Sequence, residues 1–437
     1  MNLLQDRHPC ATIEDGTVIC RRHLLAGVVA AGVVAGSSVR ASSKSATYRV
    51  GNGEKYLTFG ALPPLKPGDI VELLEGTYHE LISLRTSGLP GQPIVVRGAG
   101  AVRPIVDGIG QACSGVGKTP RAVIQISGSH IHLQNLEIRN GRNLTWNGAG
   151  VRVTGAIDTT ISRCKITSCD MGIMSDGNDL LTVDSCEIAH NGNRRHFNGY
   201  SHNLYLEGNR TRVQYCWIHD SFSGMNFKTR GQYTELFYNW ISRSNEGEIS
   251  IVDGTSTSSP YSNAVLIGNI VISKPDRTGN TAKFIDFGQD MGRERNGTLY
   301  LLHNTLVAAD ERIHFLHVGD PHSAARADAN IFFGSPNVML PGPGAITGKS
   351  NWIPEGSSLP GFTASVTSAA PGFVAPAYGN YHLAPSSPCL DVQYSGTYRD
   401  AMGVPRGGDL ALQYSAPCGF HLLTKAGTFA GALGLDS

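Results

Sequence analysis

Two short segments carry polar side chains that could act together as acid and base. They read HNLYLEG at 202–208 and MNFKTRG at 225–231. Each alternates apolar and polar residues, which is the pattern of a half-buried β-strand. Tyr205 and Lys228 stand at matching places in the two segments. Both groups can give or take a proton, so the pair is suited to general acid–base chemistry.

Other polar residues accompany this pair. If Leu204 and Phe227 point into a core, the alternation turns the polar positions outward. The residues expected on this outer face or in the loop 190–202 before it are Asp176, Arg194, Arg195, His196, His202, Asn203, Glu207, Asn226, Arg230, Glu248 and Asp253. Glu207 is expected beside Arg230, and Asp253 near it. A plain solvated face with a weak surface ion pair is the alternative reading.

An internal repeat fixes how the two segments lie. Eight segments share a central Asn or Cys with an apolar residue close behind; the centres are Asn135, Cys164, Cys186, Cys216, Asn239, Asn269, Asn304 and Asn330. A repeat of 22 or 23 residues without a helical pattern predicts a β-solenoid of stacked parallel strands. Lys228 also follows Tyr205 by 23 residues. The two side chains are therefore predicted to be neighbours on consecutive coils.

The central residues of the repeat are expected to stack inside the solenoid at a turn. Asn amides there can satisfy backbone groups of their own coil and of the next. Cys164, Cys186 and Cys216 are read as small buried replacements for Asn, with free thiols. Cys389 and Cys418 lie outside this ladder and could pair with each other.

Composition and the N-terminal segment limit the class of protein. The 437 residues are only 16% charged, include 53 glycines and carry a formal net charge of +1, so no basic field for nucleic acid is expected. Residues 20–43 contain Arg21 and Arg22 before a short apolar run, which resembles a bacterial twin-arginine export signal. We expect a signal peptide at 1–41, a single solenoid domain at 46–415, a tail at 416–437, and a secreted or periplasmic monomer with no later membrane span.

Several stretches resemble right-handed parallel β-helix proteins that act on polysaccharides. KPGDIVELLEGTYHE and GLPGQPIVVRG, within residues 55–107, resemble the N-terminal coils of that group, and the tail from YHLAPSSPCLDV to RDAMGVPRGGDLAL resembles its last coil. HNLY, KTR and GEIS resemble its polar strands. The resemblance implies an all-β right-handed parallel β-helix with an N-terminal cap. It covers nearly the whole mature chain.

The same resemblance implies a lyase that acts on an anionic polysaccharide, alginate-like or glycosaminoglycan-like, by β-elimination. Such an enzyme removes the C5 proton of a uronic acid and expels the oxygen at C4. Lys228 would be the base and Tyr205 the acid, or the reverse, with an alkaline pH optimum. Arg230 with His202 would complete the catalytic group. Asn203, Glu207, Asn226, Glu248 and Arg195 would bind substrate.

Calcium and other activities stay open at this stage. Related lyases neutralise the carboxylate with Ca²⁺, but FSGMNF (222–227) places no acid before Lys228. We expect no required cofactor, although Asn203, Glu207 and Glu248 could hold Ca²⁺. The alternatives are a glycoside hydrolase using Asp176 and Glu207, a C5-epimerase, or a non-catalytic glycan-binding solenoid.

Overall fold

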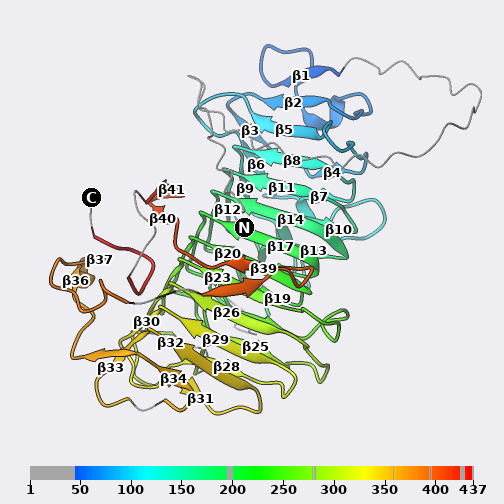
Figure 1. Ribbon diagram of the computed structural model, residues 1–437. Helices are drawn as coiled ribbons and strands as arrows, with labels where there is room; N and C mark the ends of the chain where they lie inside the picture. Colours follow the sequence, from blue (N-terminus) through cyan, green and yellow to red (C-terminus); the bar gives the residue numbers. More distant parts are fainter. Residues whose placement is uncertain are drawn as a thin grey trace, which may run out of the picture. The chain divides into compact units, whose positions relative to one another are not determined.

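Short strands separated by tight turns make up nearly all regular structure of this chain. A computed structural model describes residues 45–193, 200–277, 279, 282–357, 359–392, 394, 396–423 and 429–435. The predicted signal peptide, 1–41, lies outside this described part. Its strands form three long parallel sheets, and each coil adds one strand to each sheet (Figure 1). A parallel pair needs a long connection, and here the rest of the coil provides it.

The longest sheet holds thirteen described strands. They are β1 (Thr47–Val50), β2 (Ile70–Leu73), β5 (Ile94–Gly98), β8 (Ile131–Gln134), β11 (Thr159–Ser162), β14 (Asn178–Asp184), β17 (Gly208–Gln214), β20 (Tyr233–Phe237), β23 (Ala264–Ile267), β26 (Thr298–Leu302), β29 (Ala324–Asp328), β32 (Ala345–Lys349) and β34 (Phe362–Thr363).

The twelve-stranded sheet follows it in each coil. Its strands are β3 (Thr77–Tyr78), β6 (Ile105–Asp107), β9 (Glu137–Arg139), β12 (Lys165–Thr167), β15 (Glu187–Ala189), β18 (Trp217–His219), β21 (Trp240–Ser242), β24 (Ile270–Ile272), β27 (Thr305–Val307), β30 (Ile331–Phe333), β33 (Trp352–Pro354) and β35 (Val366–Ser368).

The ten-stranded sheet carries the two segments with which the sequence analysis began. Its strands are β4 (Ile82–Leu84), β7 (Ala122–Ile126), β10 (Ala149–Thr154), β13 (Met171–Asp176), β16 (Leu204–Leu206), β19 (Phe227–Thr229), β22 (Ile249–Val252), β25 (Lys283–Gly288), β28 (His314–Val318) and β31 (Met339–Leu340). One of the two described 3₁₀ turns, η1 (Phe59–Ala61), lies near the N-terminal coils.

One apolar core runs between the three sheets. Leu204, Phe227 and Ile249 are buried in it, as the alternation predicts. One coil cannot bury these side chains by itself, but stacked coils bury them continuously. The predicted all-β parallel β-helix is confirmed.

A buried polar ladder stacks at the turn between the thirteen- and twelve-stranded sheets. Asn239 donates to the amide oxygen of Asn269 (2.9 Å), Asn269 to Asn304 (2.9 Å), Asn304 to Asn330 (3.0 Å) and Asn330 to Asn351 (3.0 Å). Cys164, Cys186 and Cys216 continue the ladder as free, buried thiols. The predicted ladder is confirmed, and Asn351 extends it.

One position of the predicted ladder, Asn135, is wrong by one residue. Leu136, not Asn135, is the buried residue beside Cys164, because Lys165 pairs with Glu137. Asn135 precedes that position with φ 54°. Asparagine tolerates this left-handed conformation, so it is common both at such turns and in ladders.

The C-terminal segment does not form the expected last coil. After β35 the chain makes three antiparallel hairpins: β36 (Phe373–Ala375) with β37 (Asn380–Leu383) around η2 (Pro376–Tyr378), β38 (Thr397–Arg399) with β39 (Pro405–Gly407), and β40 (Leu412–Ser415) with β41 (Gly419–Leu422) (Figure 1). Leu383, Leu410 and Phe429 pack against outward apolar residues of the coils. Cys389 and Cys418 are both free, so the pairing considered for them does not form.

No helix among the described residues is long and apolar enough to cross a membrane.

Candidate active site

One column of side chains runs along the outer face of the ten-stranded sheet, with one residue from each coil. Strand register places these residues in the order Gln125, Arg152, Met174, Tyr205, Lys228, Ser250, Asp286 and His317. Tyr205 and Lys228 are direct partners in the pairing of β16 with β19. The predicted register of these two residues is therefore confirmed.

Arg230 links this pair to the end of β19. Its Nε donates to the phenolic oxygen of Tyr205 at 2.9 Å, and its Nη1 donates to the carbonyl oxygen of Asp253 at 2.7 Å. Its Nη2 donates to Asp290 Oδ2. The pKa of Arg230 is raised, because its hydrogen bonds to Tyr205 and Asp290 outweigh the opposing effect of burial. The strand register keeps Glu207 beside Arg230, but the described Arg230 side chain makes these contacts in place of an ion pair with Glu207.

Asp290 is the acidic residue that sequence analysis missed. Its Oδ2 also accepts from Lys228 Nζ at 3.1 Å, so one oxygen bridges the two cations. Burial raises the pKa of Asp290, but the positive charges of Lys228 and Arg230 lower it by more. Asp290 lies 60 residues beyond Arg230 in the chain. Asp290 lies in the loop that follows β25, and no repeat spacing indicates which side chain of this loop reaches back to Lys228 and Arg230.

Asp253 holds this loop in place. Asp253 is buried, and its carboxylate accepts hydrogen bonds from the backbone N–H groups of Asp290 (2.5 Å), Met291 (2.9 Å) and Arg293 (2.8 Å). The proximity of Asp253 to Arg230 expected from sequence is confirmed, with Nη1 at 3.7 Å from Oδ1. A buried carboxylate with several N–H donors is a rigid anchor, because each donor would lose its partner if the loop moved.

His202 lies under the pair as a neutral side chain. Its Nδ1 accepts from the N–H of Met225 at 3.0 Å, and its ring contacts Tyr205 with centroids 5.4 Å apart. Burial, and then the positive charges of Lys228 and Arg230, lower the pKa of His202 to about 3. A neutral, buried histidine packs against Tyr205 and so helps to hold that side chain in place.

Three of the predicted substrate-binding residues point into the molecule instead. Asn203, Asn226 and Glu248 are buried and continue a second ladder that begins at Asn191. Asn203 donates to Asn226 Oδ1 at 2.7 Å, and Asn226 donates to Glu248 Oε2 at 2.6 Å. Each residue comes just before the first residue of its strand. Strand alternation does not apply at these turn positions, so the outward orientation expected for them is wrong.

The other predicted residues are less closely tied to the pair. Glu207 is half-buried and accepts from the Thr255 hydroxyl at 3.4 Å. Asp176 is half-buried at the end of β13. Arg195, with Arg194 and His196, lies outside the described residues.

The residues suggested for calcium do not fit that ion. The oxygens of Asn203 and Glu248 are engaged inside the second ladder, with Glu248 Oε1 accepting from the N–H of Ser244 at 2.9 Å. Burial raises the pKa of Glu248 to about 7, which favours a neutral carboxyl. Calcium needs several charged or carbonyl oxygens around one open position. These residues do not offer that.

Another group of potential metal ligands stands elsewhere. In the described part of the chain, the ligand atoms of His190, His219 and Asp220 lie close together; His219 ends β18, and His190 and Asp220 directly follow β15 and β18. Asp220 Oδ2 already contacts His219 Nδ1 at 2.6 Å, and Arg243 donates to both of its oxygens. This group is separate from the face that carries Tyr205 and Lys228.

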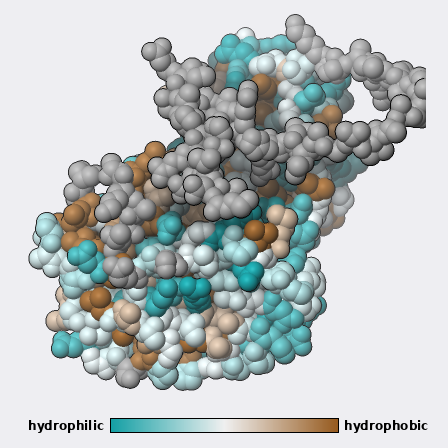
Figure 2. Space-filling model, viewed as in Figure 1, coloured by the Kyte–Doolittle hydropathy of each residue, from teal (hydrophilic) through white to brown (hydrophobic). Residues whose placement is uncertain are grey.

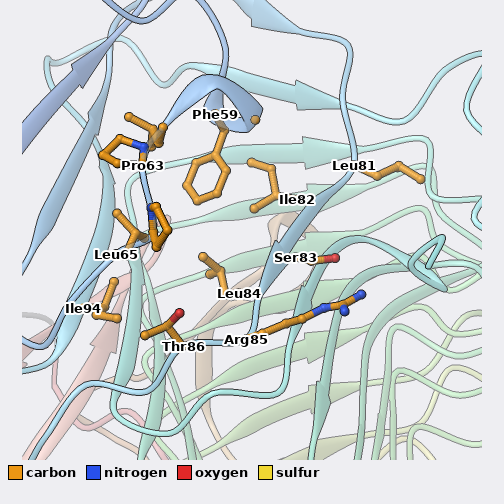
Figure 3. Close-up of a pocket in the computed structure, with 13 residues that line it drawn as sticks. Phe59, Pro63, Leu65, Leu81, Ile82, Ser83, Leu84, Arg85, Thr86 and Ile94 are labelled. Atoms are coloured by element: carbon orange, nitrogen blue, oxygen red, sulfur yellow. The ribbon is translucent and has the colours of Figure 1, made fainter.

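A pocket near the N-terminal coils has a different character. Phe59, Pro63, Leu65, Leu81, Ile82, Leu84 and Ile94 line it with Ser83, Arg85 and Thr86 (Figure 3). It borders β4, at the edge of the ten-stranded sheet, with three strands between it and β16. Its walls are mainly apolar and lack an acid–base pair.

On the side seen in Figure 2, the described surface is largely hydrophilic or neutral, with hydrophobic residues scattered over it.

Comparisons with known proteins agree with the architecture. Residues 117–269 match a family described as right handed beta helix region. No curated protein matches the chain. The crystal structure of pectate lyase Pel9A aligns with a TM-score of 0.55 and 15% identity, over 90% of this chain and 97% of that one.

Two further solved structures align less well. Alginate lyase from Paenibacillus sp. str. FPU-7 gives a TM-score of 0.45 at 18% identity, over 69% of this chain and 97% of that one. GH136 lacto-N-biosidase from Eubacterium ramulus gives 0.44 at 13% identity, over 74% and 68%. The likeness to Pel9A, at 15% identity, and the family match show the fold, a right-handed parallel β-helix, and leave the activity to be argued from the site.

Proposed function

We propose that the protein is a polysaccharide lyase that cleaves a uronic-acid-containing polysaccharide by β-elimination. The observation that carries the proposal is the pairing of Tyr205 with Lys228 on one outer face, with Arg230 Nε 2.9 Å from the phenolic oxygen. The solved structure with the highest TM-score among those described above is named a pectate lyase, which fits a polysaccharide substrate.

The contacts favour Tyr205 as the base. Arg230 donates to the phenolic oxygen, so negative charge on that oxygen is stabilised by a charge-assisted hydrogen bond. Lys228 is ion-paired with Asp290 at 3.1 Å, and a lysine ammonium is a proton donor. Of the two role assignments that the sequence allowed, we therefore propose the one with Tyr205 as base and Lys228 as acid.

The reaction then needs no water and no second substrate. The Tyr205 phenolate takes the C5 proton, the C5–H electron pair forms the C4=C5 double bond, and the C4–O bond breaks. Lys228 gives a proton to the departing glycosidic oxygen. Two of the three N–H bonds of Lys228 remain beyond its contact with Asp290, so the same ammonium can also donate to the developing enolate oxygen.

The guanidinium of Arg230 is already engaged by groups of the protein. Its nitrogens are bound to Tyr205, to the carbonyl of Asp253 and to Asp290, and the residue is only 8% exposed. We assign it the positioning and charge stabilisation of Tyr205. Export through the signal predicted at 1–41 would bring the enzyme to polysaccharide outside the cytoplasm.

Ultraviolet absorbance tests the proposal directly. A lyase produces an unsaturated uronate that absorbs in the short ultraviolet, whereas a hydrolase, an epimerase or a binding protein does not. The purified protein should generate this absorbance from at least one member of a panel of pectin, alginate and glycosaminoglycans. Absence of absorbance, together with new reducing ends, would assign hydrolysis instead.

The Lys228→Ala variant should lose the activity while keeping its fold. The Lys228 side chain lies on the outer face, so its removal leaves no core cavity. We expect product formation to fall about 10²- to 10⁴-fold, the usual contribution of a general acid, with unchanged circular dichroism and melting temperature. Lys283→Ala, which removes an ammonium from β25 of the same sheet, is the matched control and should stay active.

A further inference from the structure

The cations of the candidate site already hold an anion. Asp290 Oδ2 accepts from both Lys228 Nζ (3.1 Å) and Arg230 Nη2. Asp253, the other carboxylate in contact with Arg230, is buried beside it. Two cations and two carboxylates therefore meet here, and His202 adds no charge because it is neutral. Among these described side chains, positive and negative charge balance before Tyr205 loses its proton.

The segment that carries the Asp290 carboxylate is held in place by Asp253. Asp253 binds three backbone N–H groups of the segment 290–293, so the backbone that carries Asp290 is anchored. The Asp290 side chain is 38% exposed, so it borders the open face rather than being sealed inside. A ligand that lies over Tyr205 and Lys228 must therefore meet its charge.

We propose that Asp290 is a specificity-determining residue that selects polysaccharides whose uronosyl carboxyl groups are neutral, as in esters, over those with free carboxylates. This inference rests on the proposed lyase function and names the chemical form of its substrate. A free carboxylate must either displace Asp290 from both cations or stand beside it as a like charge, and both alternatives cost binding free energy.

Binding of an ester carries neither of these two costs in free energy, and the other groups of the site can bind it. Its carbonyl oxygen accepts hydrogen bonds, so it can accept from the N–H groups of Lys228 that do not bind Asp290. The proton at C5 is also more acidic next to an ester than next to a carboxylate. No guanidinium fork is then needed for the carboxyl group, which agrees with the engaged state of Arg230.

Paired substrates test the inference. Methyl-esterified polygalacturonate is compared with polygalacturonate, and propylene-glycol-esterified alginate with alginate, each by initial ultraviolet rate. The wild-type kcat/KM should favour the ester by at least about tenfold, the ratio expected from roughly 1.4 kcal/mol of discrimination. The polymer pair that responds identifies the sugar, and the ratio within that pair measures the preference.

Asp290→Asn supplies the decisive variant. The change removes the charge but keeps the size, so the ester-to-acid ratio should fall about tenfold or more. Because a ratio is compared, a general loss of activity does not hide the effect; where turnover is too slow, calorimetric Kd values for the two oligosaccharide forms replace the rates. Asp276→Asn removes one charge at an exposed place and should leave the ratio unchanged.

The outcomes separate this inference from the function on which it rests. A wild-type preference for the free acid that Asp290→Asn leaves unchanged would overturn the specificity while the lyase function stands. Should Asp290→Asn fail to fold, Asp290→Ala replaces it, and a wild-type preference for the free acid would still overturn the inference. No unsaturated product from any free or esterified polymer would overturn both.

Discussion

At the scale of single residues, Arg230 connects the other members of the candidate site. It donates to Tyr205, to the backbone of Asp253 and to Asp290, so it connects Tyr205, the proposed base, to the loop that borders the site. Lys228 donates to the same Asp290 oxygen that Arg230 binds. At this scale the types and spacing of Tyr205, Lys228 and Arg230 predicted that these side chains lie together, which their register and hydrogen bonds confirm. The contact of Asp290 could not be predicted, because a loop outside the repeat makes it.

Removal of one oxygen tests the role given to Tyr205. Tyr205→Phe keeps the ring against His202 but removes the base and the acceptor of the Arg230 hydrogen bond. We expect kcat to fall about 10²- to 10⁴-fold, with KM and melting temperature close to wild type. Tyr378→Phe, at a 92% exposed position on the C-terminal segment, is the control. A kcat of Tyr205→Phe close to that of the wild type would show that Tyr205 is not the base and that another residue takes the proton.

The strands and turns explain which polar residues face outward. On β16 and β19 the strict alternation holds, and Tyr205 and Lys228 are on the outer face. One residue before each strand the chain is still turning, and Asn203, Asn226 and Glu248 enter the interior ladder. The sequence pattern alone does not mark where a turn ends and a strand begins, so these three residues were placed on the wrong side.

Glu248 should make the stability of this ladder depend on pH. Its folded pKa, about 7, is above its ordinary value of 4.5. The folded state therefore binds the proton more tightly, and this stabilisation is fully present below pH 4.5 and is lost as pH rises towards 7. The loss should reach about 3 kcal/mol, from the difference between the two pKa values.

Comparison of the wild type with Glu248→Gln isolates this effect. Buried His202, with a pKa lowered to about 3, changes stability in the opposite direction between pH 3 and 6.5, but it is present in both proteins. The difference in the free energy of unfolding, wild type minus variant, should therefore decrease from pH 4.5 to 7 in urea titrations. Parallel curves across this range would show that Glu248 does not titrate there.

For the molecule as a whole, the C-terminal segment covers apolar surface that the coils leave outside. Tyr233, Ile267 and Ile331 face out of the coils and pack with Leu383 and Phe429. The resemblance of this segment to the last coil of parallel β-helix proteins had predicted another coil there. The structure shows antiparallel hairpins, since residues after β35 no longer follow the repeat.

Truncation tests whether this cover is required. A chain that ends at Ser368 would leave the outward tyrosines and isoleucines exposed as one apolar patch, and such patches promote aggregation. We expect a lower melting temperature, increased binding of an apolar dye and aggregation in size-exclusion chromatography. Tyr378→Ser, on an exposed side chain of the same segment, should change none of these. A monodisperse truncated protein with wild-type melting would show that the cover is dispensable.

The sequence by itself determined the stacking of coils and the register of Tyr205 with Lys228. The physical reason is that parallel strands on consecutive coils pair in step with the repeat length, so a 23-residue spacing places two residues side by side. Only the tertiary structure decided which groups surround that pair. Asp290 arrives from an irregular loop anchored by Asp253, and Asn203, Asn226 and Glu248 turn inward because the backbone at their positions has left the strand.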